Sequence, residues 1–357
     1  MTKGAQMSAT RMHITSPRGH RARFTGIGVA AVLALGLSAC GSSSEPGGDG
    51  TSAAGGSDEP VKIGLITKTD TNPFFVKMRE SAQAQADSHG AELIALAGKF
   101  DGDNEGQVTA IENLVSQGVR GILITPNSST GILNAIAQAR EAGVIVIALD
   151  TATDPEDAVD ATYATDNRLA GELQGKWVKA ALGDTTPQLA MLDGTPGGTV
   201  DTFRHEGFLA GIGLSEDAPE VVGMENTNGD QTKAQTAMEN LLQRSDAINA
   251  VYTINEPAAR GGYQAISDAG RADQIIIGSI DGSCQGVQDV ADGKVGATVM
   301  QFPKAMAELG VDAVVTYAQT GEKPSGFNDT GAQLITDRPF DGLDSQDTAW
   351  GLDNCWG

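Results

Sequence analysis

The sequence has no motif that marks a catalytic centre. It contains no G-x-S-x-G elbow, no G-x-x-x-x-G-K-[ST] loop, no H-E-x-x-H pair and no dinucleotide fingerprint after its first predicted strand. It has only four histidines, two of them before residue 24, and they show no metal-ligand spacing. We therefore expect no enzymatic activity, no cofactor and no metal site.

Positive charge is also scarce, with 24 lysines and arginines against 46 aspartates and glutamates, which gives a formal net charge of −22. Loss of the first 39 residues, argued below, removes five cations and no acid, so that −22 minus 5 gives −27. A surface of this sign repels a phosphate backbone, and nucleic acid is therefore excluded as a partner.

The first 39 residues contain no acidic residue and have the layout of an export signal. Their five cations precede an apolar stretch at residues 24–37, which is too short to span a bilayer as a stable helix. The stretch ends in L-S-A-C, which resembles the bacterial lipobox, so we predict a lipoprotein signal peptide at residues 1–39 and a lipidated Cys40. Cleavage elsewhere, with Cys40 an ordinary thiol, is the alternative.

Residues 40–60 are predicted to form a lipidated, flexible tether. Every residue from 41 to 60 is Gly, Ser, Ala, Thr, Asp, Glu or Pro, and such a segment buries too little apolar surface to offset its ordering entropy. The lipid and the tether predict an extracytoplasmic protein anchored to the outer face of the cytoplasmic membrane.

Cysteine is rare, with three in the whole chain. Once Cys40 is assigned to the anchor, Cys284 and Cys355 remain as an even pair in an oxidising compartment. This favours a disulfide that fixes the C-terminal tail to the body, although two free thiols remain the alternative.

The rest of the chain alternates short apolar runs with helical segments. The predicted strands are residues 61–67, 91–97, 121–125, 144–149, 188–192, 221–225, 250–254, 274–280 and 297–300. The predicted helices are residues 74–88, 104–116, 130–142, 168–182, 200–212, 232–242, 258–269, 285–291 and 303–320. This alternation, over about 300 residues, predicts an α/β fold with two doubly wound, parallel-sheet, Rossmann-like lobes.

Polar and aromatic side chains follow the ends of several predicted strands, where open parallel sheets bind ligands. They are Asn72, Phe74, Phe75, Asp150, Asn255, Glu256, Asp281 and Gln301. Amides and carboxylates pair with hydroxyl groups, which both donate and accept hydrogen bonds, and aromatic rings offer flat apolar faces. The set predicts a neutral polyhydroxylated ligand.

Other interpretations of these residues stay open. One of the two adjacent rings, Phe74 or Phe75, can belong to the core, and Asp150 and Asn255 can serve as turn or helix caps. Asp150 and Asp281 can also form the acid and base of a glycoside hydrolase, given a suitable separation.

Five motifs resemble the type I periplasmic sugar-binding proteins, in particular the ribose-binding group. They are T-x-x-N-P-F-F at residues 69–75, A-L-D at 148–150, I-N-E-P-A-A at 254–259, I-D-G at 280–282 and Q-F-P at 301–303. The resemblance covers about residues 61–324. Residues 101–114, 200–208 and 252–259 and the terminal C-W-G are similar to a subgroup associated with fructose and related sugars.

The resemblance implies a type I periplasmic-binding-protein fold, in which a three-crossover hinge joins two lobes that close on a sugar. It implies an N-terminal lobe of residues 61–164 plus 302–335 and a C-terminal lobe of residues 165–301 plus 336–357. By matched position, Asn72, Phe74, Phe75 and Asp150 contact sugar from one side, and Asn255, Asp281 and Gln301 from the other. The implied partners of this monomer are a monosaccharide or polyol and an ABC permease with its ATPase.

Three positions depart from the ribose-binding pattern. Thr151 stands where that group has an arginine, and the group's ring-binding arginine lies two places before Arg204, which makes Arg204 a register-shifted candidate ligand. The group's second-lobe aromatic falls near Gly229. These differences argue against ribose itself.

Two other classes of protein have the same pair of lobes but a different function from solute transport. A sugar-responsive repressor needs a helix-turn-helix and a basic face for DNA, and this acidic chain has a predicted export signal instead. A receptor for a sugar or an autoinducer, which signals through a membrane kinase or chemoreceptor, remains the alternative to transport. The sequence does not identify the sugar.

Overall fold

Runs of buried aliphatic residues form two six-stranded sheets within residues 59–357, the part of the chain that the computed structural model describes. The predicted signal peptide, Cys40 and nearly all of the predicted tether lie outside the described residues. The strands of the first sheet are β1 (Lys62–Thr67), β2 (Glu92–Ala97), β3 (Gly121–Ile124), β4 (Ile145–Leu149), β5 (Ala161–Ala164) and β11 (Gly326–Asp329). They are all parallel, in the order β11-β5-β4-β3-β1-β2.

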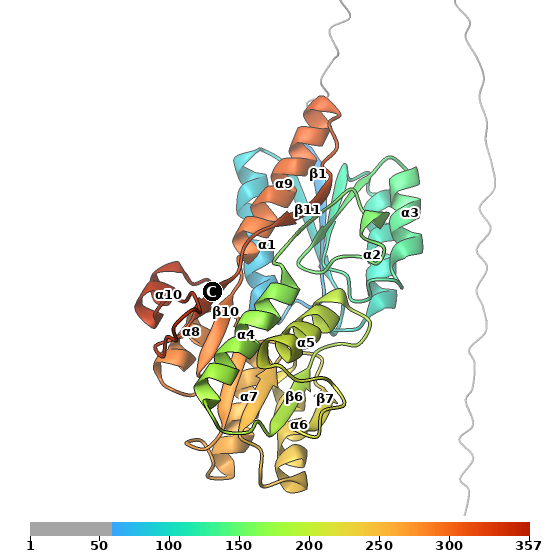
Figure 1. The fold of residues 1–357 in the computed structure, drawn as a ribbon. Helices are drawn as coiled ribbons and strands as arrows, with labels where there is room; N and C mark the ends of the chain where they lie inside the picture. Colours follow the sequence, from blue (N-terminus) through green and yellow to red (C-terminus); the bar gives the residue numbers. More distant parts are fainter. Residues whose placement is uncertain (1–58) are drawn as a thin grey trace, which may run out of the picture. The chain divides into compact units, whose positions relative to one another are not determined.

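Helices cover both faces of the first sheet. They are α1 (Pro73–Ser88), α2 (Asn104–Ser116), α3 (Leu133–Glu141) and α9 (Pro303–Thr320), with a short 3-10 turn η1 (Glu156–Ala158). Because side chains alternate along a strand, Ile63 and Leu65 of β1 pack with α1 and α9, whereas Ile66 packs with α2 and α3. Figure 1 shows the same division of the four helices around β1.

The second sheet is parallel except at one edge. Its strands are β6 (Leu189–Asp193), β7 (Val221–Asn226), β8 (Ala250–Thr253), β9 (Ile276–Asp281), β10 (Ala297–Met300) and β12 (Gln333–Ile335). Their order is β12-β10-β9-β8-β6-β7, and β12 runs antiparallel to β10. The prediction of two doubly wound α/β lobes is confirmed, and the antiparallel edge strand adds to it.

Two helices of the second lobe pack unusually closely. The lobe contains α4 (Asn167–Leu182), α5 (Thr199–Ile212), α6 (Gln231–Arg244), α7 (Glu256–Asp268), α8 (Cys284–Ala291) and α10 (Thr348–Asn354). Where α4 meets α5, a Cβ at Gly171 would collide with the carbonyl of Arg204, and a Cβ at Gly207 would collide with the carbonyl of Arg168. Glycine is therefore required here for close contact between helices.

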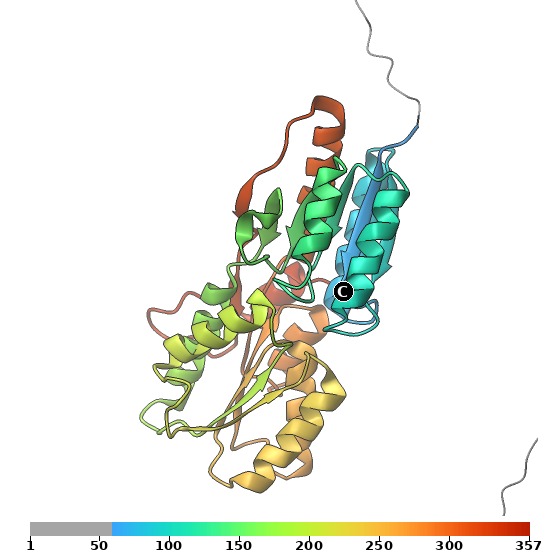
Figure 2. The same ribbon diagram turned by 90° about the vertical axis from the view of Figure 1, so that its right-hand side faces the viewer.

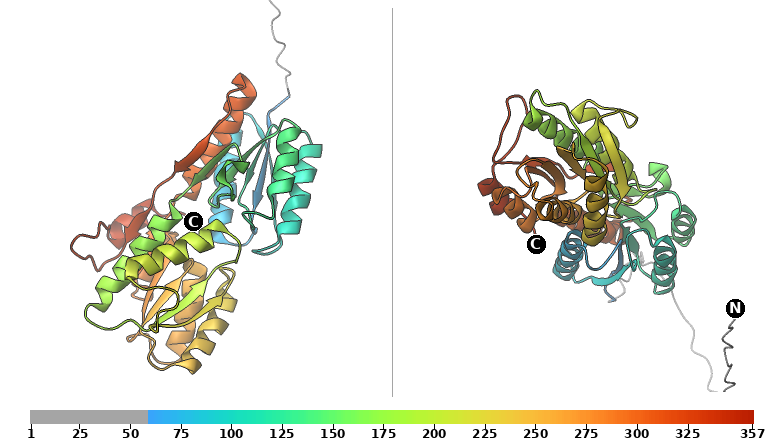
Figure 3. Two further views of the ribbon diagram at one scale, coloured as in Figure 1. Left: turned by 45° about the vertical axis from the view of Figure 1, so that its right-hand side comes forward. Right: turned by 90° about the horizontal axis from the view of Figure 1, so that it is seen from below.

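The chain crosses between the lobes three times, after β5, after β10 and after β11. Figure 2 and Figure 3 show the second lobe, with its yellow and orange elements, and the segments that join it to the first. The first and third crossovers are tied together, since Thr165 Oγ1 donates to Gly331 O at 3.0 Å. The expected N-terminal lobe, which ran to residue 335, is too long: Gln333–Ile335 pairs with β10 in the second sheet.

Several elements differ from those predicted. The short strands β5, β11 and β12 and the C-terminal helix α10 were not predicted. The third helix begins at Leu133 and not at residue 130. The side chain of Ser129, the residue before the expected start, does not cap a helix there: Ser129 Oγ donates to Ala152 O at 2.8 Å and accepts from Thr199 N at 2.9 Å. Among the described helices, none combines the length and the apolar character needed to cross a membrane.

Candidate functional site

A cleft opens where the carboxyl ends of the two sheets face each other. It contains about 480 Å³ of space that no atom fills, including the part open to solvent. Its lining includes all eight residues expected to contact sugar: Asn72, Phe74, Phe75, Asp150, Arg204, Asn255, Asp281 and Gln301. The fold therefore gathers, from both lobes, residues that lie far apart in the sequence.

The first turn of α1 supplies the aromatic part of the cleft. Asn72 is the N-cap of α1, and its Oδ1 accepts from Phe74 N at 3.0 Å, so the cap fixes the start of the helix beside the cleft. Phe74 and Phe75 are both buried and meet edge to face, with ring centroids 5.5 Å apart. Both rings belong to the core of the first lobe and line the cleft as well.

Asp150, directly after β4, has a backbone φ of 62°, in the left-handed region that non-glycine residues rarely adopt. Its Oδ2 accepts from Thr151 Oγ1 at 2.9 Å, and its carbonyl accepts from Asn167 Nδ2 at 3.3 Å. Thr151 thus fixes the neighbouring carboxylate at the position where the ribose-binding group has an arginine. A strained residue that its surroundings hold in this way is characteristic of a binding site.

Arg204 of α5 lines the cleft and is only 3% exposed. Its Nε donates to Asn167 Oδ1 at 2.8 Å, and its Nη1 donates to Ile254 O at 2.9 Å. Its Nη2 lies 4.0 Å from Asp150 Oδ1, and its Nη1 lies 4.0 Å from Asp281 Oδ1. The register-shifted arginine therefore does line the cleft, between two carboxylates.

Asp281, at the end of β9, forms a buried polar pair with Gln301. Gln301 Nε2 donates to Asp281 Oδ1 at 3.0 Å. Burial raises the pKa of Asp281 to about 8, and the carboxylate of Glu256 adds to this effect, while Arg204 opposes it. Gln301 Oε1 is buried and has no hydrogen-bond partner among the described residues.

Glu256 does not line the cleft but supports the turn that follows Asp281. Its carboxylate accepts from Gly282 N at 2.8 Å, from Ser283 N at 3.2 Å and from Thr298 Oγ1 at 2.9 Å. Burial also raises the pKa of Glu256. This residue, which follows a strand as the cleft residues do, holds the backbone that carries Asp281.

Asn255 is both a helix cap and a cleft residue. Its Oδ1 accepts from Ala258 N at 3.0 Å, which leaves its Nδ2 to donate to Gly229 O at 3.3 Å. Gly229 has a φ of 61°, and a Cβ there would lie 2.5 Å from Asn255 Nδ2. A side chain at Gly229 would therefore displace Asn255.

Five polar residues of the cleft were missed in the sequence. They are Lys68, Asp101, Thr195, Asp201 and Asn228. Lys68 directly follows β1, and the others lie just after β2, β6 and β7 or in the first turn of α5. The rule of searching after strand ends, applied to every strand, would have found most of them.

Three of these residues join the lobes directly. Thr195 Oγ1, in the second lobe, donates to Asp101 Oδ1, in the first, at 2.6 Å. Asn228 Nδ2 donates to Asp101 O at 3.0 Å. The lobes therefore contact each other at the cleft through Asp101, as they also do where Ser129 accepts from Thr199 N.

The cleft offers donors and acceptors together. Its cations are Lys68 and Arg204, and its acids are Asp101, Asp150, Asp201 and Asp281. Burial raises the pKa of Asp201, with a further contribution from the charge of Asp193. Within residues 59–357, no group of three or more His, Cys, Asp or Glu side chains is arranged to hold a metal ion.

The family model and the relatives that match this chain all describe binding proteins. Residues 63–323 match the model of a family described as the periplasmic binding protein domain. The chain is 32% identical over 258 residues to the ribose import binding protein RbsB of Bacillus subtilis, covering 72% of this chain and 82% of that protein. It is 30% identical over 284 residues to the galactofuranose-binding protein YtfQ of Escherichia coli, covering 77% and 87%.

The solved structures that are similar to this chain are binding proteins as well. An ABC transporter solute binding protein from Agrobacterium vitis, with bound D-fucose, is similar to this chain with a TM-score of 0.74 and 27% identity. The similarity covers 83% of this chain and 100% of that one. A solute binding protein from Mycobacterium smegmatis, with bound glycerol, has a TM-score of 0.72 at 27% identity, over 82% of this chain and 96% of that one.

Proposed function

This chain belongs to the type I periplasmic sugar-binding proteins of ABC transporters, and we propose that it captures a neutral monosaccharide or polyol in the cleft between its lobes. Like the relatives that it resembles, it is a binding protein and not an enzyme. Its function is therefore to bind and release a solute, without covalent chemistry.

The placement of Arg204 carries the proposal. This buried guanidinium lies 4.0 Å from the carboxylate of Asp150 in one lobe and 4.0 Å from that of Asp281 in the other. A vicinal diol can accept from the guanidinium and donate to a carboxylate at the same time. Gln301 Oε1, an acceptor without a partner in the described part of the chain, provides one more place for a hydroxyl.

The charges of the cleft support a neutral ligand. Two cations face four acids, of which Asp281, with a pKa of about 8, is largely protonated at neutral pH. Even with Asp281 neutral, three carboxylates outnumber the two cations. A sugar phosphate or sugar acid would add negative charge to this set, so such ligands are disfavoured.

Among neutral sugars, we favour a fructose-like ligand. The segments at residues 101–114, 200–208 and 252–259 are similar to a subgroup associated with fructose. Thr151 stands where the ribose-binding pattern has an arginine, and the aromatic residue of that pattern falls near Gly229, which lines this cleft, so we expect the cleft to differ from a ribose site.

The proposed cycle needs only hinge motion. A sugar that contacts both lobes at once favours the closed arrangement, and the ABC permease and its ATPase then receive the loaded protein. A lipid on Cys40 and a tether of residues 41–60 would keep the protein beside the permease. Delivery to a membrane kinase or chemoreceptor is the alternative. An uptake assay with labelled sugar separates the two, because loss of this protein abolishes uptake only in the transport case.

Thermal unfolding of the purified protein with a panel of ligands tests the proposal. The panel contains D-fructose, D-ribose, D-fucose, myo-inositol, glycerol, gluconate and an amino acid mixture. A ligand that binds only the native state raises the melting temperature, by an amount that grows with its concentration above Kd. We expect a neutral sugar or polyol to give the largest shift; a shift with amino acids and none with sugars would contradict the proposal.

A further inference from the structure

The penultimate residue of the chain lies behind the cleft. Trp356 is 6% exposed and follows Cys355, which is bonded to Cys284 at the start of α8. Cys284 N also donates to Trp356 O at 3.0 Å. The tail is therefore attached to the second lobe by a covalent bond and a backbone hydrogen bond.

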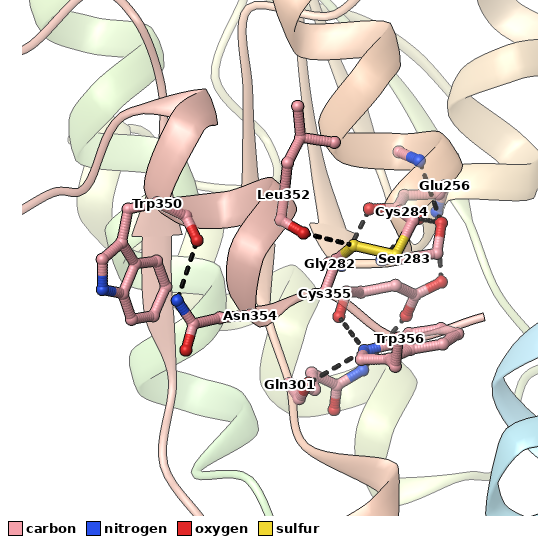
Figure 4. The surroundings of a disulfide bond; sticks show 12 residues. Glu256, Gly282, Ser283, Cys284, Gln301, Trp350, Leu352, Asn354, Cys355 and Trp356 are labelled. Carbon is pink, nitrogen blue, oxygen red and sulfur yellow. Dashed lines mark hydrogen bonds between the residues drawn. A yellow bond between two sulfur atoms is a disulfide. The ribbon is translucent and has the colours of Figure 1, made fainter.

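The indole contacts both lobes. Its Nε1 donates to the carbonyls of two cleft residues, Asp281 at 3.2 Å and Gln301 at 3.0 Å. Figure 4 shows the ring beside Gln301 and the disulfide. On the other side its ring meets Phe74 of the first lobe edge to face, with centroids 5.5 Å apart and planes at 77°. Trp356 itself does not line the cleft.

These contacts fix parts of the cleft relative to one another. One donor shared by two carbonyls holds the ends of β9 and β10 in register, and the side chains of Asp281 and Gln301 project from those ends. The same ring supports Phe74, the apolar face on which a sugar would pack. A ring that is buried, hydrogen-bonded and tethered has little freedom, so it can hold both groups to a few tenths of an ångström, as a specific site requires.

We propose that Trp356 is a positioning residue of the sugar site, kept in place by the Cys284–Cys355 disulfide. This inference rests on the proposed function. Trp356 sets the distance between the aromatic face and the Asp281–Gln301 pair, and it thereby determines sugar affinity without touching the sugar.

Isothermal titration with D-fructose and the other sugars of the panel tests the inference. We expect Trp356→Leu, which loses both the ring and the donor, to weaken binding by tenfold or more. Trp356→Phe, which keeps a ring edge but no N–H, should show an intermediate loss. The matched control is Trp350→Leu, on α10 of the same tail, where the tryptophan side chain packs with Val287, Met300 and Ile335. We expect this variant to bind sugar with the affinity of the wild type.

A double-mutant cycle separates positioning from general structural support. If Trp356 acts through Phe74, then Trp356→Leu and Phe74→Leu together weaken binding by less than the product of the two single effects. Equal affinity of Trp356→Phe and wild type, or fully multiplicative losses in the cycle, would overturn the inference. If Trp356→Leu does not fold, the sugar affinity of Trp356→Phe tests the inference by itself. Wild-type protein that binds no panel sugar would instead contradict the proposed function.

Discussion

Arg204 Nη2, in the second lobe, lies 4.0 Å from Asp150 Oδ1, in the first, and both side chains are buried. This contact is longer than a hydrogen bond and leaves the two groups oriented towards the same space. Burial of opposite charges at such a distance is costly unless other polar groups complete their hydrogen bonding. The hydroxyl groups of a sugar would do so and would favour closure of the lobes.

Replacement of Arg204 by lysine should weaken sugar binding by at least tenfold. Lysine keeps the charge, but its single ammonium group cannot bond Asn167 and Ile254 while it also faces the two carboxylates. Isothermal titration measures the loss. Arg168→Lys on α4 is the control, because Arg168 forms an exposed ion pair with Glu206. We expect the control variant to bind sugar as the wild type does. Equal affinity of the two variants would contradict the role of Arg204.

Gly171→Ala should destabilise the protein although alanine favours helices. In an exposed helix this change stabilises by about 1 kcal/mol, but here the new Cβ meets the carbonyl of Arg204 and forces α4 and α5 apart. We expect a lower melting temperature and weaker sugar binding together. Gly262→Ala in α7, where the new Cβ meets only Leu192 Cδ1 at 3.0 Å, is the milder control. Equal melting temperatures for the two variants would argue against tight α4–α5 packing.

Asp281 should make the ligand-free protein less stable as pH rises. Burial and Glu256 raise its pKa from 3.8 to about 8, so the folded state holds a proton that the unfolded state has released. This contribution is complete below about pH 4 and is lost as pH rises through about 8. Melting temperatures from pH 5 to 8 should therefore fall more steeply for wild type than for Asp281→Asn. Parallel curves would show that Asp281 is ionised throughout.

Loss of the disulfide should cost stability through the unfolded state. Cys284 and Cys355 are 71 positions apart, and closure of a loop of that length stabilises a protein by about 4 kcal/mol in the chain-entropy treatment. Denaturant unfolding of Cys355→Ser measures this difference. The double variant with Cys284→Ser should match the single one; a double variant as stable as wild type would indicate that the bond does not form in solution.

The fold was predictable from sequence because its signals are local. Asn104–Ser116, Pro303–Thr320 and Ala297–Met300 were predicted with the bounds that the structure gives. The strands that were missed, β5, β11 and β12, have only three or four residues, and long-range pairing, not local periodicity, defines them. The lobe boundary implied by the resemblance placed Gln333–Ile335 in the first lobe, whereas this strand pairs with β10 of the second sheet.

The cleft was predictable where a residue lies within two positions of a strand end, as with Asp150 and Asn255. It was not predictable where a contact depends on packing between distant elements. Trp356 forms a hydrogen bond with Asp281, which is 75 positions away in the sequence, and no local sequence pattern predicts this contact. Arg204 was identified by similarity, and the structure places it in the lining of the cleft.

A crystal structure of the protein grown with the panel sugar that gives the largest thermal shift tests the central claim most directly. The account predicts one sugar between the lobes, with hydroxyl groups within hydrogen-bond distance of Arg204, Asp150 and Asp281 and an apolar face against Phe74 or Phe75. A sugar bound outside this cleft, or one inside it that contacts neither Arg204 nor the two carboxylates, would contradict the account.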